Sequence, residues 1–307
     1  MVRGLLVFTV LTMASGLKVA VIGGGISGLS CARRLHELGH SATVMDTGKR
    51  AIGGRCSSRA ISVGDERVVF DHSAQMISLS AAGASSPFGD VVHAGVASGA
   101  LREWNAENLG VLSRADGGSE FELTRGALSE GGTRFFAGAD DGMAALPKLL
   151  AEALPRDAIQ RPVWVSKMVR EGRDWRCFHY DRDLGTFGAV VIAHNGKCAA
   201  RLTQKSGIDG VNRLLRTKFA PAAPRAGGGQ LHLSSLWVLC VALRGMPAPA
   251  REVEGAVVEG CETLSWVART DAKRGAGCGC LSTWTLVSTR GFGSANKVGA
   301  RRRATLA

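Results

Sequence analysis

Hydrophobic and polar positions near the start of the chain follow a strand pattern, then a helical pattern, then a strand pattern again. Residues 18–22 carry four consecutive apolar side chains, as a buried strand does. Apolar residues then recur at helical spacing over residues 26–38, and Gly39 follows as a stop signal. A second apolar run over residues 43–45 ends at Asp46. The pattern therefore predicts a βαβ unit with two parallel strands.

Glycine residues occupy the turn from the first strand into the helix. Residues 23–28 read Gly-Gly-Gly-Ile-Ser-Gly, the GxGxxG arrangement of dinucleotide-binding Rossmann folds. The first glycine allows the tight turn, the second lets the backbone approach a pyrophosphate, and the third lets the helix pack on the strand. The helix N-terminus offers N–H groups to the phosphates, and an acid ending the second strand accepts a ribose hydroxyl. The predicted cofactor contacts in this unit are Gly23, Gly25, Ile26, Ser27, Gly28 and Asp46.

A second pair of glycines follows the second strand. Gly53 and Gly54 precede Arg55, and a glycine pair with an arginine suits close approach to a phosphate or a flavin ring. At this point the sequence resembles the renalase-like branch of the flavin-containing amine oxidases, and its later motifs are most similar to the plant and algal members. The segments that carry the resemblance are residues 23–29, 53–59, 70–75, 193–198, 253–256, 264–266 and 284–289.

The resemblance covers residues 18–298 and implies a fold and a cofactor. The implied fold is α/β: a Rossmann-like FAD-binding domain, with a parallel sheet plus a β-meander, and a second α+β substrate domain built on an antiparallel sheet. The implied cofactor is FAD, with NAD second. Gly53, Gly54 and Arg55 would line its flavin half, and the backbone of Val165 would hold its adenine. An ordinary strand residue is the alternative for Val165.

Four side chains are candidates for contact with substrate or for catalysis. The resemblance places the loop after the strand at residues 67–70 close to the flavin, so His72 is a candidate proton carrier. A histidine next to Asp71 in an ordinary capped loop is the alternative. Lys273 is the lysine expected to lie closest to the site. His194 and Lys197 follow a buried strand, and ligands gather at strand C-termini in such sheets.

The rest of the chain alternates between helical and strand patterns. Helices are expected over residues 91–104, 143–154 and 202–219, with Pro155 ending the second. Strands are expected over residues 67–70, 163–175 as a meander, 187–193, 236–243, 253–259, 264–268 and 284–288, the last four antiparallel. A glycine-rich connection covers residues 115–132. The predicted division is 17–80 with 136–200 for the FAD-binding domain, 81–135 with 201–298 for the substrate domain, and a basic tail at 299–307.

Composition narrows the classes of partner. The chain has 307 residues and is 45% hydrophobic, enough to bury a large core and form two domains. The net charge is +12, but basic residues are spread out and form no stripe with aromatic residues. We therefore expect a small-molecule substrate and no nucleic-acid partner. No segment reaches the ~20 apolar residues of a membrane span, so no stable span is expected.

The first residues have the pattern of a targeting segment. Arg3 precedes an apolar stretch, and small residues at 14–16 offer a cleavage position. We expect residues 1–16 to direct the protein to the secretory pathway or a plastid, with a soluble cytoplasmic protein as the alternative. The eight cysteines are scattered and fit buried free thiols. Cys278 and Cys280 form the one close pair, which is insufficient to predict a metal site, so no metal is expected.

Three functions fit these observations. The leading one is an FAD-dependent oxidoreductase that transfers hydride from a small reduced substrate, an amine or a dihydronicotinamide, to flavin. The resembled family continues past residue 298 with a second flavin motif that has no match here, so we expect a truncated chain. A truncated chain favours the second function, an FAD- or nucleotide-binding pseudoenzyme. The third, an NAD-dependent dehydrogenase, is disfavoured by residues 53–55 and 70–72.

Overall fold

The computed structural model describes residues 16–114, 120–219, 234–245, 253–275 and 281–297. Its N-terminal part is the predicted βαβ unit, with β1 (Lys18–Ile22), α1 (Ile26–Glu37) and β2 (Ser41–Met45). The strands join β10 (Ile159–Gln160) and β14 (Ala189–Ile192) in a four-stranded parallel sheet of order β10-β2-β1-β14. Leu29 and Ala32 of α1 are buried in the core cluster that contains Val19 and Val44. The strand and helix patterns near the start of the chain are thus confirmed.

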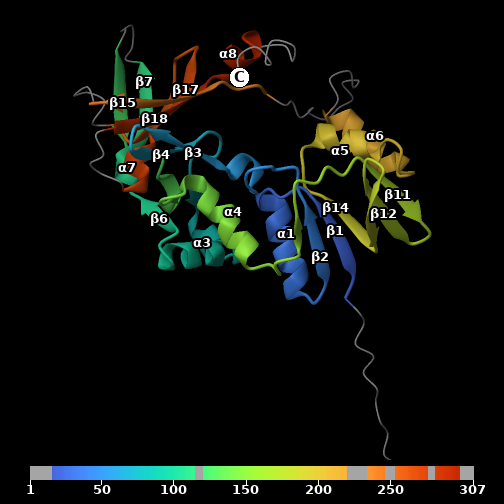
Figure 1. Cartoon of the computed structure of the whole chain (residues 1–307). Coiled ribbons are helices and arrows are strands. Elements are labelled where there is room, and N and C mark those ends of the chain that lie inside the picture. The colour runs from blue at the N-terminus through green and yellow to red at the C-terminus, as the bar shows by residue number, and fades with distance from the viewer. Residues whose placement is uncertain (1–15, 115–119, 220–233, 246–252, 276–280, 298–307) are drawn as a thin grey trace, which may run out of the picture.

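A β-meander covers this sheet on the side away from α1 (Figure 1). It consists of β11 (Lys167–Glu171), β12 (Asp174–His179) and β13 (Arg182–Phe187), all antiparallel. Phe187 and Met168 share a core cluster with Ala20 and Ile22 of β1. The meander begins later than expected, because Val163 and Val165 precede β11 and are not part of a strand.

The second large sheet has six strands in the order β15-β18-β17-β16-β7-β8. Its members are β7 (Leu109–Arg114), β8 (Phe121–Arg125), β15 (Val238–Arg244), β16 (Gly255–Val258), β17 (Leu264–Arg269) and β18 (Leu281–Ser288). Four of the five neighbouring pairs in this sheet are antiparallel, but β16 pairs with β7 in parallel, so the sheet is mixed. The glycine-rich connection predicted over residues 115–132 was wrong in part, since β8 lies within it.

Smaller elements connect the two sheets. A hairpin of β3 (Ser58–Val63) and β4 (Glu66–Asp71) and a three-stranded sheet of order β5-β9-β6 lie between them. The latter contains β5 (Ile77–Leu79), β6 (Leu101–Trp104) and β9 (Arg134–Gly138). The helices in this region are α2 (Ala81–Ala84), α3 (Pro87–Ala97), α4 (Ala145–Glu152) and α7 (Thr270–Arg274). Of these, α4 packs on α1. A further helix, α8 (Arg290–Ala295), follows β18.

The helix predicted over residues 91–104 was wrong in its second half. The helix α3 ends at Ala97, with Ser98 as its C-cap and Gly99 at a φ of +75°. A left-handed backbone ends a helix readily at glycine, because glycine carries no Cβ. Leu101 and Trp104 are therefore free to become the buried positions of strand β6.

Residues 201–219 pack differently from the expectation that they begin the substrate domain. They belong to α5 (Gly196–Thr203) and α6 (Asp209–Phe219), which lie beside the meander in Figure 1. Leu202 is part of the core cluster that contains Ala20 and Phe187. The division into two discontinuous domains otherwise stays a prediction.

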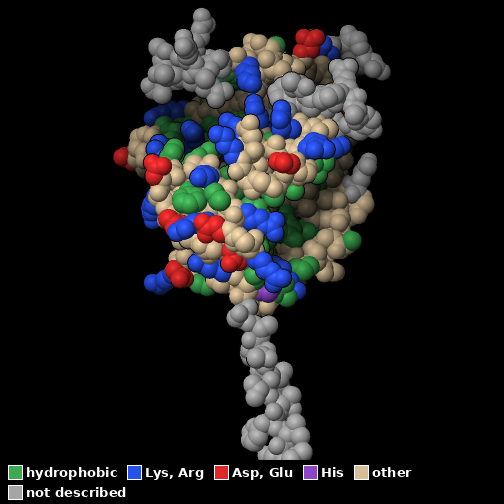
Figure 2. Space-filling view, turned by 90° about the vertical axis from the view of Figure 1, so that its right-hand side faces the viewer, with side chains coloured by type: hydrophobic (Ala, Val, Ile, Leu, Met, Phe, Trp, Pro, Cys, Tyr) green, Lys and Arg blue, Asp and Glu red, His purple; other side chains and the backbone are tan. Residues whose placement is uncertain are grey.

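Among the described helices, none is both long and apolar enough to cross a bilayer. Three expectations concern segments outside the described residues: the targeting segment apart from Gly16, the Cys278–Cys280 pair, and the basic tail. On the face shown in Figure 2, Lys and Arg side chains are spread over the surface with Asp and Glu between them.

Candidate functional site

The three glycines of the first turn have three different environments. Gly23 has a φ of +118°, in the region that favours glycine. A Cβ on Gly28 would lie 1.9 Å from the carbonyl oxygen of Gly23, so helix and strand meet there without room for a side chain. A Cβ on Gly25 would meet nothing within 4 Å. Gly25 therefore faces open space at the start of α1, as a residue that approaches a pyrophosphate must.

The N-terminus of α1 is suited to an anion. Gly25 is its N-cap, no side chain caps it, and its first turn holds no acidic residue. The N–H groups and the positive end of the helix dipole are therefore not neutralised by the protein there. Ile26 and Ser27 form this first turn, and Ser27 is exposed. These residues could hold a phosphate through their backbone N–H groups.

Asp46 lies directly after β2 and next to this turn. Its Oδ2 accepts a hydrogen bond from the N–H of Gly24 at 2.8 Å, and its Oδ1 accepts one from Gly48 at 2.7 Å. A carboxylate can accept about four hydrogen bonds, so each oxygen retains capacity for a ligand hydroxyl. The carboxylate is thus fixed in orientation beside the glycine turn and only partly buried.

The second glycine pair lies against the first turn. The N–H of Gly53 donates to the carbonyl of Gly24 at 2.8 Å, and Gly53 forms an isolated bridge with Gly25. Gly53 and Gly54 have φ values of +119° and +56°, and a Cβ on Gly54 would lie 3.6 Å from the Cα of Gly25. Arg55 follows with an exposed side chain. Two segments that are separate in the sequence therefore form one continuous backbone surface.

Val165 belongs to a segment that is hydrogen-bonded to Asp46. The N–H of Val163, two residues earlier, donates to the carbonyl of Asp46 at 2.7 Å. The Val165 side chain is buried in the core, and no described residue is hydrogen-bonded to its backbone N–H or carbonyl. That backbone could pair with the edge of an adenine.

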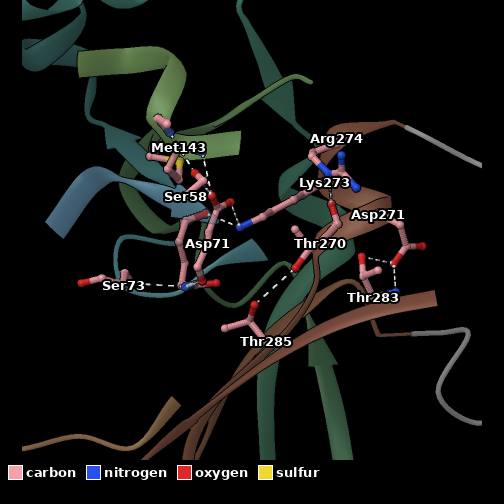
Figure 3. Close-up of polar contacts among 12 residues, drawn as sticks. Ser58, Asp71, Ser73, Met143, Thr270, Asp271, Lys273, Arg274, Thr283 and Thr285 are labelled. Carbon is pink, nitrogen blue, oxygen red and sulfur yellow. Dashed lines mark hydrogen bonds and ion pairs between the residues drawn. The ribbon is translucent and has the colours of Figure 1, made fainter. Parts of the chain in front are cut away.

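Asp71 and Lys273 form an ion pair with completely buried side chains (Figure 3). Lys273 Nζ lies 2.6 Å from Asp71 Oδ2 and donates to the carbonyl of Gln75 at 3.0 Å. Burial lowers the pKa of Lys273, and the Asp71 carboxylate opposes that shift. The structure thus places Lys273 inside the protein and not at the wall of an open cavity.

His72 follows Asp71 and is half-buried. Burial lowers the pKa of His72, the Arg59 charge lowers it further, and Asp71 partly opposes both. A lowered pKa keeps the imidazole neutral at neutral pH. Its buried Nδ1 has no hydrogen-bond partner among the described residues, and neither does the buried Oε1 of Gln75. Both atoms therefore have capacity for a further hydrogen bond.

The other sequence candidates lie elsewhere. His194 lines a pocket of about 460 Å³ between β14, the meander and α6, whose lining is mostly apolar. The residues of the glycine turn do not line this pocket. Burial lowers the pKa of His194, and Lys197 is exposed at the start of α5.

Sequence reasoning assigned no role to three residues that the structure brings to the site. Gly24 donates to Asp46, and a Cβ on it would lie 2.7 Å from Ile52. Asp71 pairs with Lys273, and Arg59 acts electrostatically on His72. A charged residue directly after the apolar run Val68–Phe70 could have indicated that Asp71 is buried, because a carboxylate next to a core strand requires a partner.

Comparisons with known proteins agree with this geometry. Residues 21–88 match the family model of the NAD(P)-binding Rossmann-like domain. No curated protein sequence matches the chain.

Solved structures match most of the chain at low sequence identity. Cyclohexylamine oxidase from Brevibacterium oxydans matches with a TM-score of 0.61 and 12% identity, covering 95% of this chain and 80% of that one. An oxidoreductase from Methanosarcina mazei gives 0.63 and 12%, covering 94% and 81%. Reduced UDP-galactopyranose mutase gives 0.63 and 12%, covering 90% and 75%. The chain therefore has the α/β fold of these enzymes, with a Rossmann-like domain and a second sheet.

Proposed function

We propose that this chain binds FAD and acts as a flavin-dependent oxidoreductase. The observation that carries the proposal is the open space at Gly25, which lies at an uncapped helix N-terminus and is bridged to Gly53. A pyrophosphate requires such a backbone surface, and the adjacent Asp46 carboxylate suits the ribose. The resemblance to the renalase-like branch implies that the Val165 backbone holds the adenine. This arrangement supports a dinucleotide that is bound with its pyrophosphate at the glycine turn, its ribose at Asp46 and its flavin along the segment after Gly53.

The chain's own residues position and shield the reacting groups. When bound, FAD supplies a ring that accepts hydride, so no protein nucleophile is required. Arg55 is exposed next to the glycine pair and can place its positive charge near that ring. The neutral His72 is only half-buried and can accept a proton or a hydrogen bond from a substrate.

The proposed substrate is a small reduced molecule, an amine or a dihydronicotinamide. Support comes from the resemblance to the renalase-like branch of the amine oxidases, and from the amine oxidases among the structural matches. A dihydronicotinamide gives up hydride alone and becomes a pyridinium cation, whereas an amine that arrives as an ammonium ion must also give up a proton before the hydride leaves, which requires a proton acceptor beside the ring. His72 is proposed for that role.

A visible spectrum tests the proposal most directly. The full chain is purified, incubated with FAD, and separated from unbound cofactor. Retained bands near ~370 and ~450 nm indicate bound flavin. Anaerobic addition of amines and of dihydronicotinamides should then bleach the ~450 nm band with at least one of the two classes. A colourless protein would contradict FAD binding.

The alternatives predict other outcomes of the same experiment. An NAD-dependent dehydrogenase is favoured by the family-model match over residues 21–88, and it would bind NADH while remaining colourless. A pseudoenzyme would retain FAD but stay oxidised with every substrate of both classes. Titration of the purified chain with FAD and with NADH separates the first alternative from the proposal.

A further inference from the structure

Asp71 and Lys273 join parts of the chain that are far apart in the sequence. Asp71 is the last residue of β4, and Lys273 belongs to the short helix α7 before β18. Both side chains have 0% exposure, and their charged atoms lie 2.6 Å apart. The Lys273 ammonium also lies 5.8 Å from the centre of the Trp104 ring. Figure 3 shows Lys273 extended from α7 across to the carboxylate.

Each member of the pair is fixed by further contacts. Asp71 Oδ1 accepts hydrogen bonds from Ser58 Oγ at 2.6 Å and from the N–H of Met143 at 2.8 Å. Ser58 Oγ in turn accepts one from the N–H of Ala144 at 3.0 Å. The carboxylate therefore has one orientation, with Oδ2 directed at Lys273. A buried pair held in this way defines a single arrangement of the two segments.

Lys273 also contacts the segment that carries His72. Its Nζ donates to the carbonyl of Gln75 at 3.0 Å, so the ammonium holds Asp71 and Gln75 at the two ends of residues 71–75. Within this segment the N–H of Ala74 donates to the carbonyl of Arg55 at 3.0 Å. Lys273 is thus connected through residues 71–75 to the loop that follows Gly53.

The Gly53–Arg55 loop is in turn hydrogen-bonded to the glycine turn before α1. Gly53 donates to the Gly24 carbonyl at 2.8 Å. A continuous series of contacts therefore runs from α7 beside the six-stranded sheet, through residues 71–75 and 53–55, to the start of α1. Its middle part carries the buried unpartnered atoms His72 Nδ1 and Gln75 Oε1.

A purely stabilising role does not explain a charged pair at this place. Replacing buried ion pairs by apolar residues is often neutral or stabilising, so such pairs contribute weakly to stability and can specify one arrangement. A direct chemical role for Lys273 is also a poor fit, because its side chain has no exposed surface through which to meet a substrate.

We propose that Lys273 is a positioning residue: through its ion pair with Asp71 and its hydrogen bond to Gln75, it fixes residues 71–75 and the Gly53–Arg55 loop at the flavin half of the site. This inference rests on the proposed FAD-binding function for its ligand, but the fixed segment is a property of the protein alone. The nucleotide half, formed by the glycine turn and Asp46, is joined to Lys273 only indirectly through these two segments, so it should be less affected by loss of Lys273 than the flavin half.

Hydrogen exchange on the protein without cofactor tests the positioning directly. In Lys273→Met, the Ala74 amide should exchange about tenfold faster than in the wild type, while the β1 amides of Val19 and Val21 change less than about twofold. The matched control is Lys148→Met, which removes a lysine from the exposed pair with Asp141 and should leave Ala74 unchanged. An equal increase in exchange rate at all these amides, or no increase at Ala74, would overturn the proposal.

A second variant covers the case in which Lys273→Met does not fold. Asp71→Asn combined with Lys273→Met removes both charges, so no buried charge is left without a partner. The same selective rise at Ala74 is expected, because the bond from Nζ to the Gln75 carbonyl is also lost. Equal protection of Ala74 in this variant and the wild type would overturn the proposal.

Ligand binding then separates the two halves of the site. ADP contacts the nucleotide half alone, whereas FAD also contacts the flavin half. In the variant that folds, the Kd for FAD should rise about tenfold and the Kd for ADP by less than about twofold. An equal loss of affinity for FAD and for ADP would overturn the proposal. If the wild type binds no FAD, the proposed function fails, and the Ala74 exchange alone decides whether Lys273 positions the segment.

Discussion

Gly28 packs so closely on Gly23 that a Cβ on Gly28 would lie 1.9 Å from the Gly23 carbonyl oxygen. The backbone atoms of Gly23 and α1 cannot yield as a flexible side chain can, so Gly28→Ala must push the helix away from the turn that follows β1. We expect the free energy of unfolding to fall by ~1–3 kcal/mol, the usual effect of overpacking. Urea denaturation of the variant and the wild type measures this difference in the free energy of unfolding.

A second glycine provides the control for this variant. Gly210 lies in α6, and a Cβ on it would meet nothing within 4 Å. Gly210→Ala should therefore leave stability unchanged or raise it by up to ~1 kcal/mol, because alanine favours the helix. Gly28→Ala with wild-type stability would show that helix and strand are not in contact at Gly23.

Gly25→Val should remove cofactor binding while the fold is retained. The Gly25 backbone has a φ of −78°, which any residue adopts, and its Cβ would point into open space. The valine side chain would then occupy the place proposed for the pyrophosphate. We expect the Kd for FAD to rise at least about a hundredfold, since several phosphate contacts are lost together.

The measurement is a flavin fluorescence titration with the melting temperature recorded in parallel. Gly210→Val places the same side chain at an open position in α6 and should bind FAD like the wild type. Normal FAD binding by Gly25→Val would refute the assignment of this turn to the pyrophosphate.

The sequence was sufficient to predict that the glycine turn and Asp46 lie side by side, because the determinants of that arrangement are local. Glycines at fixed spacing and an acid after the second strand lie within one βαβ unit, and the structure places them together as expected. The role of Asp71 could not be predicted, because its partner Lys273 is distant in the sequence. Lys273 also contacts Gln75, from which it is separated by 198 positions. The pairing exists only after the second sheet has packed on the β3–β4 hairpin.

The same distinction explains the wrong predictions of secondary structure. Residues 101–104 continue an apolar pattern that also fits a helix, and only their pairing with β9 makes them a strand. The antiparallel pairing predicted among β15, β16, β17 and β18 is confirmed, but their sheet also contains β7, which was not predicted as a strand and pairs with β16 in parallel. Local patterns contain no information on such partners.

Acid should destabilise the protein through two histidines. Burial lowers the pKa values of His72 and His194 below 6.5, the ordinary value for histidine. As the pH falls below 6.5, the unfolded chain binds protons at these positions before the folded chain does. The free energy of unfolding should therefore be unaffected by them above that pH and decrease with falling pH below it.

Urea denaturation at several pH values checks this prediction. The double variant His72→Gln/His194→Gln should show a smaller loss of stability between pH ~7.5 and ~5.5 than the wild type. The exposed His93 provides the control, and His93→Gln should follow the wild type. An unchanged pH dependence in the double variant would show that neither histidine is protected from protonation.

Asp46 has both a structural and a proposed binding role, and a pair of ligands separates them. Asp46→Asn replaces one acceptor oxygen by a donor opposite the N–H of Gly24 or Gly48, so some loss of stability is expected. If the carboxylate also accepts the ribose 2′-hydroxyl, the wild type should bind ADP about tenfold more tightly than 2′-deoxy-ADP. In Asp46→Asn that difference should shrink to less than about threefold, whatever the absolute affinities. Calorimetric titration of both proteins with both ligands gives the four dissociation constants. Equal discrimination by wild type and variant would place the ribose away from Asp46 and leave this residue a purely structural acceptor for the turn.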